Sequence, residues 1–568
     1  MLPANAIFDR IRAATGLGVR GRAAWALVAA LHLVAVGILI WSEAGLAPKF
    51  AFVLAWGFTN FFWLMVLRRP VLSAALSLVL LVVLVLLSRL KFQMLLTTVS
   101  FVDVMIIDRN TIDYLFTIFH GLGFTVAVVA MVLMPLLVLC WWLDTLRVPR
   151  RFALAGFVAS ICGLGGVAAW EPLDHVESFY GGNFLSSFAR SGVEAISEFT
   201  LNGFMESDAV VVERLQSAKE TTCAPAHRPP HIIVVHDESS FDIRMAPGIK
   251  VPEGYGAHFR SYDGKQRQFL VEGAGGPSWY TEYNVFSGLS ARSFGRFAYF
   301  VTHLAAGRVE RGLPNALRRC GYTTFSLYPW LGAFMSARNF QSTAGVQRFH
   351  DIGDLGSKNL EPDSFFYNEA ARIIERERAT GPIFIFTYLA ANHFPWTSRY
   401  RPELMPEWRD PGNAPKIDEY LRRQAMSAND YSNFVARLKR DFPEEAFLIV
   451  RFGDHQPEFA ADIIEPGLDQ SKLAQRLMAY DLRYLTTYYA IDAINFTPID
   501  ISSALNALDA PYLPLMVQEA AGLPLDPSFA EQKKILQRCR GMFYACASGA
   551  EARRFNRLLI DAGLIKRL

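Results

Sequence analysis

The segment His231-Ile-Ile-Val-Val-His-Asp-Glu238 is a short apolar run that ends on residues able to bind a metal or move a proton. Two later segments have the same form, 382–393 (PIFIFTYLAANH) and 446–455 (AFLIVRFGDH). Short continuous apolar runs predict buried parallel strands. In an open α/β sheet the site lies at the carboxyl ends of such strands, so the residues that end these runs are predicted to converge. They are Glu238, His393, Asp454 and His455.

The sequence from residue 231 onward alternates strand-like runs with helical stretches such as 363–379 and 418–440. That alternation predicts an α/β domain with a largely parallel sheet. A linker, Thr221–Pro230 (TTCAPAHRPP), ends where the first strand begins. We therefore assign residues 231–568 to this domain.

Most of the long apolar runs lie before residue 171, and they account for the high hydrophobic content of 52%. Five segments are long and apolar enough to span a bilayer, at about 23–42, 50–67, 70–89, 120–143 and 152–170. The first is not a cleavable signal, because its apolar core is long, no Ala-x-Ala-like site stands out and further spans follow it. Residues 1–170 are thus predicted to form a five-helix transmembrane domain.

Lysine and arginine are distributed unevenly between the two sides of these spans, with nine on the side of the N-terminus and four on the other. The nine are Arg10, Arg12, Arg20, Arg22, Arg68, Arg69, Arg147, Arg150 and Arg151; the four are Lys49, Arg89, Lys91 and Arg109. Positive loops stay in the cytoplasm, so the N-terminus is predicted to be cytoplasmic and everything after residue 171 to be exported. The formal net charge of +3 gives no case for nucleic-acid binding.

Two segments near the predicted outer surface leave alternatives open. Residues 171–230 carry aromatic side chains among glycines and polar residues, which indicates helices lying along the bilayer surface or, equally well, packing against the exported domain. The aromatic residues are Phe179, Tyr180, Phe184, Phe188, Phe199 and Phe204.

Between the third and fourth spans, Lys91 and Asp103 flank an apolar segment. Either Asp103 caps a helix and Lys91 is solvated, or the segment engages a lipid head group.

Four of the six cysteines lie in the exported part, and Cys140 and Cys162 lie in spans as small apolar residues. An even number in an oxidising compartment permits two disulfides, with three connectivities possible. The local pair Cys539–Cys546 is favoured, which would leave Cys223–Cys320.

The segment Glu272-Gly-Ala-Gly-Gly-Pro-Ser278 is a glycine-rich turn that presents a hydroxyl at the start of a probable helix. A hydroxyl at a helix N-terminus faces unpaired N–H groups and suits a phosphate, and a metal or base would make it a nucleophile. Glu238, Asp454 and His455 are candidate ligands of a divalent cation that would activate Ser278. Alternatively Ser278 only caps the helix. His236 and Asp237 compete with Glu238 and are ranked behind it.

These motifs resemble those of the lipoteichoic acid synthase and phosphoglycerol transferase branch of the alkaline phosphatase–sulfatase superfamily, and five spans before an exported domain resemble that family's layout. The matching stretches are Val235-His-Asp-Glu238-Ser, Gly276-Pro-Ser278-Trp-Tyr-Thr-Glu282, Asn392-His393-Phe-Pro and Gly453-Asp454-His455. The resemblance implies that Ser278 is both nucleophile and metal ligand beside Glu238, Asp454 and His455. It implies that His393 contacts the phosphate or the leaving group and that Arg338, in Ala337-Arg338-Asn, grips phosphate.

Three departures from the family pattern bear on the chemistry. Ser278 stands where threonine is usual, so Thr281 is kept as an outside candidate for the nucleophile. Tyr328-Pro-Trp330 stands where the family has a substrate-binding histidine, which leaves the transferred group open. Asp454-His-Gln-Pro457 differs from the Asp-His-Gly-Glu of lipid A phosphoethanolamine transferases, which argues against lipid A as acceptor.

The resemblance implies a membrane-bound phosphotransferase of the bacterial inner membrane with a periplasmic catalytic domain. It would move the head group of phosphatidylglycerol through a Ser278 intermediate to a hydroxyl of an envelope glycan or polymer. The expected cofactor is Mn²⁺, with Zn²⁺ or Mg²⁺ as alternatives. The alternatives for function are a phosphoethanolamine transferase that takes phosphatidylethanolamine, and a non-catalytic envelope-binding protein.

Overall fold

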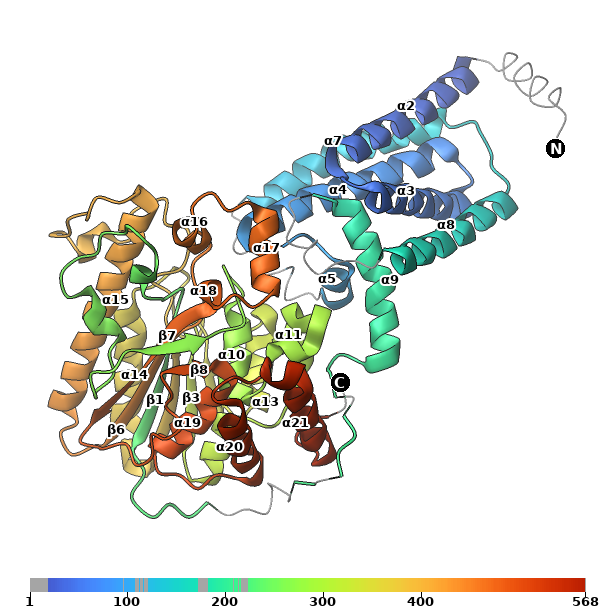
Figure 1. Cartoon of the computed structure of the whole chain (residues 1–568). Coiled ribbons are helices and arrows are strands. Elements are labelled where there is room, and N and C mark those ends of the chain that lie inside the picture. Colours follow the sequence, from blue (N-terminus) through green and yellow to red (C-terminus); the bar gives the residue numbers. More distant parts are fainter. Residues whose placement is uncertain are drawn as a thin grey trace. The chain divides into compact units, whose positions relative to one another are not determined.

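The protein is described here from a computed structural model, which describes residues 19–95, 97–107, 112, 116, 121–171, 182–207, 209–212, 214–215 and 223–566 (Figure 1). The chain divides into two compact units, Met1–Leu201 and Asn202–Leu568. The three-part division at residues 170 and 230 stays a prediction. Outside the described residues lie Arg10, Arg12 and Arg109 of the charge count, Phe179 and Tyr180 of the aromatic segment, and the first two residues of the linker.

The first unit contains five helices that are long and apolar enough to cross a membrane, as the sequence predicts. They are α2 (Val19–Ser42), α3 (Leu46–Leu67), α4 (Pro70–Leu95), α7 (Leu122–Leu143) and α8 (Arg150–Trp170). Helix α8 packs closely on α3 because glycines line the contact: a Cβ added to Gly156 would lie 2.5 Å from the Phe61 ring. Small residues of this kind let helix backbones approach each other in membranes.

Two shorter helices, α5 (Phe101–Ile106) and α9 (Phe184–Asn202), complete the described part of this unit. Asp103 accepts the Ser100 N–H at 2.6 Å in a capping box at the start of α5. It also forms an ion pair with Lys91 at 2.8 Å. The helix-capping interpretation of Asp103 is therefore confirmed, Lys91 is paired with it, and head-group binding there stays a prediction.

The second unit is built on an eight-stranded sheet with the order β4-β3-β5-β1-β6-β7-β2-β8. The strands are β1 (His231–Asp237), β2 (Arg267–Leu270), β3 (Thr323–Leu327), β4 (Arg348–His350), β5 (Ile383–Tyr388), β6 (Phe447–Gly453), β7 (Thr486–Ile494) and β8 (Ala507–Asp509). Only β7 runs against the others among these strands, because it pairs antiparallel with both β6 and β2. The predicted α/β fold with a largely parallel sheet is confirmed, and the linker ends where β1 begins.

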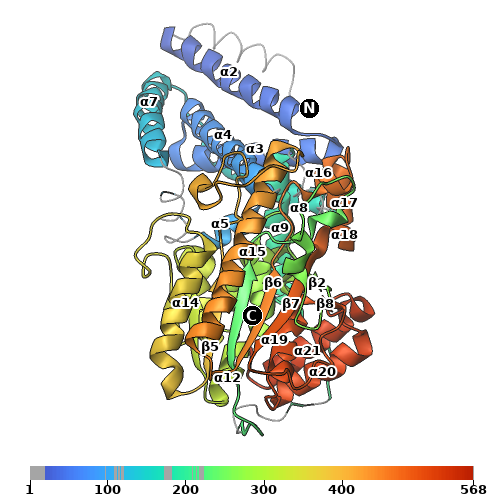
Figure 2. The ribbon, with the colours of Figure 1, turned by 90° about the vertical axis from the view of Figure 1, so that its left-hand side faces the viewer.

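Helices α14 (Asp363–Glu377) and α15 (Pro415–Asp441) lie side by side along one face of the sheet (Figure 2). Their apolar side chains share a buried core with alternate residues of β1, β3, β5 and β6. Helix α10 (Ser278–Ser287) lies on the other face, where Phe286 meets Phe386 of β5 at 4.6 Å between ring centroids. Side chains alternate between the two faces along each strand. The sheet is therefore buried on both sides, as its continuous apolar runs require.

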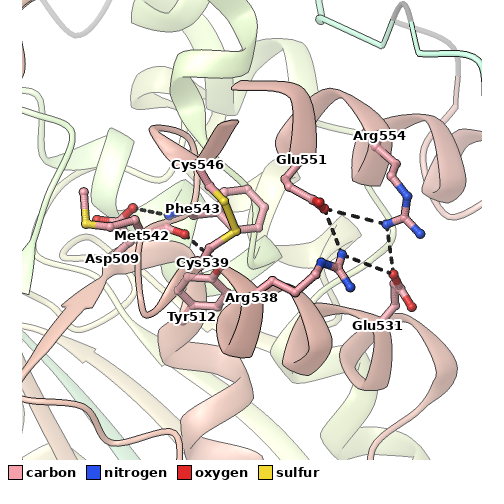
Figure 3. Close-up of a disulfide and its surroundings, with 10 residues drawn as sticks. All are labelled: Asp509, Tyr512, Glu531, Arg538, Cys539, Met542, Phe543, Cys546, Glu551 and Arg554. Atoms are coloured by element: carbon pink, nitrogen blue, oxygen red, sulfur yellow. Dashed lines mark hydrogen bonds and ion pairs between the residues drawn. A yellow bond between two sulfur atoms is a disulfide. The ribbon is translucent and has the colours of Figure 1, made fainter. Parts of the chain in front are cut away.

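The other helices of this unit connect and cover the strands. They are α11 (Val301–Ala305), α12 (Leu313–Arg319), α13 (Ala337–Thr343), α16 (Ala460–Ile464), α17 (Gln470–Met478), α18 (Leu482–Leu485), α19 (Leu513–Ala520), α20 (Pro527–Cys539) and α21 (Ala550–Asp561). Two disulfides, Cys223–Cys320 and Cys539–Cys546, confirm the favoured pairing. Figure 3 shows the second beside two arginine–glutamate pairs that join α20 to α21, Arg538–Glu551 and Arg554–Glu531, each at 2.9 Å.

The two disulfides should differ in how much they stabilise the fold. Cys223–Cys320 closes a loop with a sequence separation of 97 residues, whereas Cys539–Cys546 closes one of 7. In the chain-entropy description the first is worth about 4.7 kcal/mol and the second about 2.4 kcal/mol. We expect Cys320→Ser to lower the melting temperature of the detergent-solubilised protein about twice as much as Cys546→Ser. Equal losses would contradict this account.

Candidate active site

The three apolar runs that end on candidate site residues form the three central strands of the sheet, in the order β5-β1-β6. All three are parallel, with Asp237 of β1 opposite Gly453 of β6 and His236 opposite Tyr388 of β5. Their carboxyl ends therefore meet at one edge of the sheet, where ligands bind in open α/β folds. The predicted convergence arises from this register.

Ser278 lies at the start of α10 with its hydroxyl directed at the strand ends. Its Oγ is 3.2 Å from Nε2 of His455 and 3.3 Å from Oε2 of Glu238. The N-cap of α10 is Pro277, and no side chain caps the helix there. The alternative that Ser278 only caps the helix is therefore wrong, because its hydroxyl interacts with two candidate metal ligands.

The turn after β6 fixes Asp454 and His455. Oδ1 of Asp454 accepts the N–H groups of Ser239 and His455, both at 2.8 Å. Nδ1 of His455 lies 2.9 Å from the Gln456 carbonyl, which can only accept, so Nδ1 carries the proton and Nε2 faces Ser278. Gly453 is required for this approach, since an added Cβ would lie 1.8 Å from the Ser240 carbonyl oxygen.

Glu238 and His455 control each other's charge. Burial opposes ionisation of both, but hydrogen bonding and the positive charge of His455 lower the pKa of Glu238. The negative charges of Asp454 and Glu238 raise the pKa of His455 to about 9. The buried carboxylates thus attract one cationic partner, and a proton on His455 fills that role here.

The same residues fit a divalent cation in chemistry and spacing. Ligands of one tetrahedral Zn²⁺ at about 2.1 Å are about 3.4 Å apart. Nε2 of His455 lies 3.2 Å from the Ser278 hydroxyl, 3.3 Å from Glu238 and 3.4 Å from Asp454. Oδ2 of Asp454 is buried with no hydrogen-bond partner among the described residues. Carboxylate, imidazole and hydroxyl donors suit Zn²⁺ and Mn²⁺.

His393 lies beyond β5, close enough for the charges of Glu238, His455 and Asp454 to act on it. Its Nδ1 is 2.9 Å from the Phe394 carbonyl and so carries the proton, which leaves Nε2 as a base. Burial lowers the pKa of His393, which favours the neutral ring. His393 thus lies within electrostatic range of the Ser278 cluster, and its Nε2 is available to accept a proton.

Arg338 is not joined to this cluster by any hydrogen bond or ion pair among the described residues. It lies at the start of α13, where its guanidinium pairs with Asp351 at 2.8 Å and Asp354 at 2.7 Å. The central carbon of the guanidinium lies 4.8 Å from the centroid of the Phe349 ring. Two carboxylates already neutralise this arginine, and its role in holding phosphate stays a prediction.

Tyr388 is a site residue that the sequence reasoning missed. Its hydroxyl donates to Oε2 of Glu238 at 2.6 Å from the last position of β5. The sequence did contain a sign of this residue, since a tyrosine ends the apolar run that leads to His393.

Asp237, a predicted competitor of Glu238, points to the opposite face of β1. It accepts a hydrogen bond from Tyr488 at 2.6 Å and lies 3.0 Å from His258, so it does not compete with Glu238.

Behind the His393 loop, Asp363 at the start of α14 is fully buried and gives a pH-dependent contribution to stability. It accepts the Ala391 N–H at 3.2 Å and the Ser427 hydroxyl at 2.5 Å. Burial, then the charge of Asp237, raise the pKa of Asp363 to about 8.

The folded state therefore keeps a proton that the unfolded chain releases near its ordinary pKa of 3.8. This contribution is complete below that pKa and is lost as pH rises toward 8. We expect Asp363→Asn to gain stability relative to the wild type between pH 4 and pH 8, by up to several kcal/mol. Melting curves over this range test it, and a constant difference would contradict it.

Comparison with known proteins gives a family match for part of the chain. Residues 275–486 match the sulfatase family model, which confirms the predicted sulfatase-like domain for that segment. The matched segment contains Ser278, Arg338, His393, Asp454 and His455 and begins after Glu238. No curated protein matches the chain in sequence.

Several solved structures are similar to it at low identity. The phosphoglycerol transferase GacH of Streptococcus pyogenes, in complex with sn-glycerol-1-phosphate, has 14% identity and a TM-score of 0.46, over 61% of this chain and 88% of that one. The lipooligosaccharide phosphoethanolamine transferase A of Neisseria meningitidis, an integral membrane protein, has 12% identity and a TM-score of 0.42, over 84% and 95%. The lipoteichoic acid synthase LtaP of Listeria monocytogenes has 14% identity and a TM-score of 0.38, over 52% and 73%.

Proposed function

We propose that this protein is a membrane-bound, metal-dependent phosphotransferase that moves the head group of a phospholipid, phosphatidylglycerol first, onto a hydroxyl of an envelope glycan. One observation carries the proposal: the Ser278 hydroxyl lies within 3.3 Å of both Glu238 and His455, at a helix N-terminus and the carboxyl edge of the sheet. A hydroxyl held among metal ligands is an activated nucleophile.

In the first step Ser278 attacks the head-group phosphorus, an Oγ–P bond forms, and the bond from phosphorus to the diacylglycerol oxygen breaks. A divalent cation bound by Glu238, Ser278, Asp454 and His455 would lower the pKa of the hydroxyl and neutralise phosphate oxygens. The proton of the Ser278 hydroxyl passes to Nε2 of His393, and from there to the departing diacylglycerol oxygen. Arg338 is proposed to bind the phosphate oxygens after its ion pairs with Asp351 and Asp354 break.

In the second step the acceptor hydroxyl attacks the phosphorus and gives its proton to His393, the Oγ–P bond breaks, and His393 returns the proton to the Ser278 oxygen. The neutral His393 ring, with Nε2 free of its own proton, suits this role. Two in-line displacements at one site explain why a transferase uses a nucleophile, and the proposed ion is Mn²⁺, with Zn²⁺ or Mg²⁺ as alternatives.

The location of the domain is part of the proposal. We infer an inner-membrane protein with a cytoplasmic N-terminus and a periplasmic catalytic domain. Two disulfides in the second unit support an oxidising compartment. The five apolar helices would keep the site beside its lipid donor.

The test is peptide mass spectrometry of the full chain after incubation with phosphatidylglycerol and Mn²⁺. We expect a glycerophosphate adduct on Ser278 that is missing from Ser278→Ala. An adduct of phosphoethanolamine mass, formed only with phosphatidylethanolamine, would keep the mechanism and change the donor. Bound metal with no adduct from either lipid would overturn the proposal in favour of a hydrolase or a binding protein.

A further inference from the structure

His236 lies on β1 two residues before Glu238, so the strand presents both side chains on the same face. It is completely buried, and Asp237 between them points to the other face. One oxygen of Glu238, one of Asp454 and one ring nitrogen of His236 all lie within 4.8 Å of one another. The strand thus brings the His236 imidazole close to the carboxylates of Glu238 and Asp454, on the face of β1 opposite to Asp237.

Aromatic rings hold the His236 side chain in place. The Tyr388 ring stacks on it at 3.8 Å with an interplanar angle of 8°, and the rings of Phe452 and Phe386 lie 5.1 Å and 5.9 Å away. Such a cage would suit phenylalanine, because burying an unpaired polar group costs about 1 to 3 kcal/mol. Neither ring nitrogen of His236 has a hydrogen-bond partner among the described residues. A buried histidine whose two ring nitrogens make no hydrogen bond indicates a ligand.

The spacing between His236 and Asp454 indicates what that ligand is. Nε2 of His236 lies 2.9 Å from Oδ2 of Asp454, yet the two atoms are not aligned as donor and acceptor. Two ligands bound to one ion at about 2.1 Å and at right angles are about 3 Å apart. The other oxygen of Asp454 is already held by two backbone N–H groups, so Oδ2 is the one left for an ion.

We propose that His236 is a further metal ligand, whose Nε2 binds the divalent cation together with Asp454 and Glu238. This inference rests on the metal site of the proposed function and not on which head group is transferred. With His455, it gives the site two imidazoles in addition to its carboxylates and hydroxyl. Nitrogen ligands of this kind favour Zn²⁺ over Mg²⁺.

The competing account is that His236 only positions Asp454 as part of the surrounding structure. Glu282, one turn after Ser278 on α10, is buried and acts electrostatically on His236, so the imidazole could link two carboxylates without touching an ion. Loss of a positioning residue also weakens metal binding, by about 10- to 100-fold. Affinity alone therefore does not separate the two accounts, whereas the number of imidazoles on the ion does.

The experiment loads the full detergent-solubilised chain with Zn²⁺ alone and counts imidazole ligands by X-ray absorption spectroscopy. We expect two in the wild type and in His231→Phe, which removes a histidine from the other end of β1. In His236→Phe, loaded at a Zn²⁺ concentration high enough to fill the site, we expect one imidazole and a Zn²⁺-over-Mg²⁺ preference at least tenfold smaller than in the wild type. The metal-free His236→Phe protein should melt no lower than the wild type, because its ring fills the aromatic cage.

A single imidazole in the wild type, or an unchanged count in His236→Phe, would overturn the proposal. If His236→Phe unfolds, His236→Gln replaces it, and the same count decides. Failure of the proposed function looks different: no lipid would leave an adduct on Ser278, although the wild type would still bind Zn²⁺ through two imidazoles. Conversely, an adduct with a single imidazole would keep the function and reject His236 as a ligand.

Discussion

Ser278→Ala is expected to lose head-group transfer by about 100,000-fold, because removing a nucleophile abolishes the covalent route and leaves only binding and electrostatic effects. Ser278 is 7% exposed and its hydroxyl contacts Glu238 and His455, so no water molecule in bulk solvent can take the place of the hydroxyl without rearrangement. Release of diacylglycerol from labelled phospholipid measures the loss. Ser278→Thr keeps a hydroxyl at the same position and should retain part of the activity.

Thr281 provides the matched control, since it was the outside candidate for the nucleophile. It lies on the same helix, is fully buried, and its hydroxyl donates to the Asp454 carbonyl at 2.6 Å. We expect Thr281→Val to lose less than about tenfold, through a lost hydrogen bond worth about 1 kcal/mol. Loss of turnover in Thr281→Val together with full activity in Ser278→Ala would reverse the assignment.

The sequence predicted the fold well because its strongest signals are local. The five spans follow from length and apolarity, and the parallel sheet follows from runs that are apolar on both faces. Convergence of Glu238, Asp454 and His455 followed from one rule, that parallel strands end at one edge. The disulfide Cys539–Cys546 was predicted from proximity in sequence. The second, Cys223–Cys320, followed because these were the two exported cysteines that remained.

The remaining features depend on contacts that no local pattern determines. Alternation shows that His236 and Asp237 face opposite sides of β1, but only the packing of α10 and α14 decides which face carries the site. For the same reason the Tyr388 hydroxyl was missed, since it reaches Glu238 across a strand pair. The carboxylates that bind Arg338 lie 13 and 16 residues away from it, in a loop with no regular period.

Glu238→Gln and Asp237→Asn should give opposite results although the two residues are adjacent. Glu238 faces Ser278 and His455, whereas Asp237 is occupied by His258 and Tyr488 on the other face. Replacing a charged metal ligand by an amide should weaken Zn²⁺ or Mn²⁺ binding by at least about 100-fold and turnover by about 1,000-fold. Asp237→Asn keeps an oxygen acceptor on a face that no candidate ligand shares, and should bind metal as the wild type does.

Metal titrations of the chelator-treated protein, followed by transfer assays, measure both quantities. Chelation alone should remove wild-type activity, and adding a divalent ion should restore it, whereas Glu238→Gln should recover only at much higher metal concentration. Equal losses in Glu238→Gln and Asp237→Asn would mean that both substitutions act by destabilising the fold. Melting temperatures equal to that of the wild type would exclude this explanation. A wild-type protein that stays active after complete chelation would rule out the metal, because the buried carboxylates would then be neutralised by the proton on His455 alone.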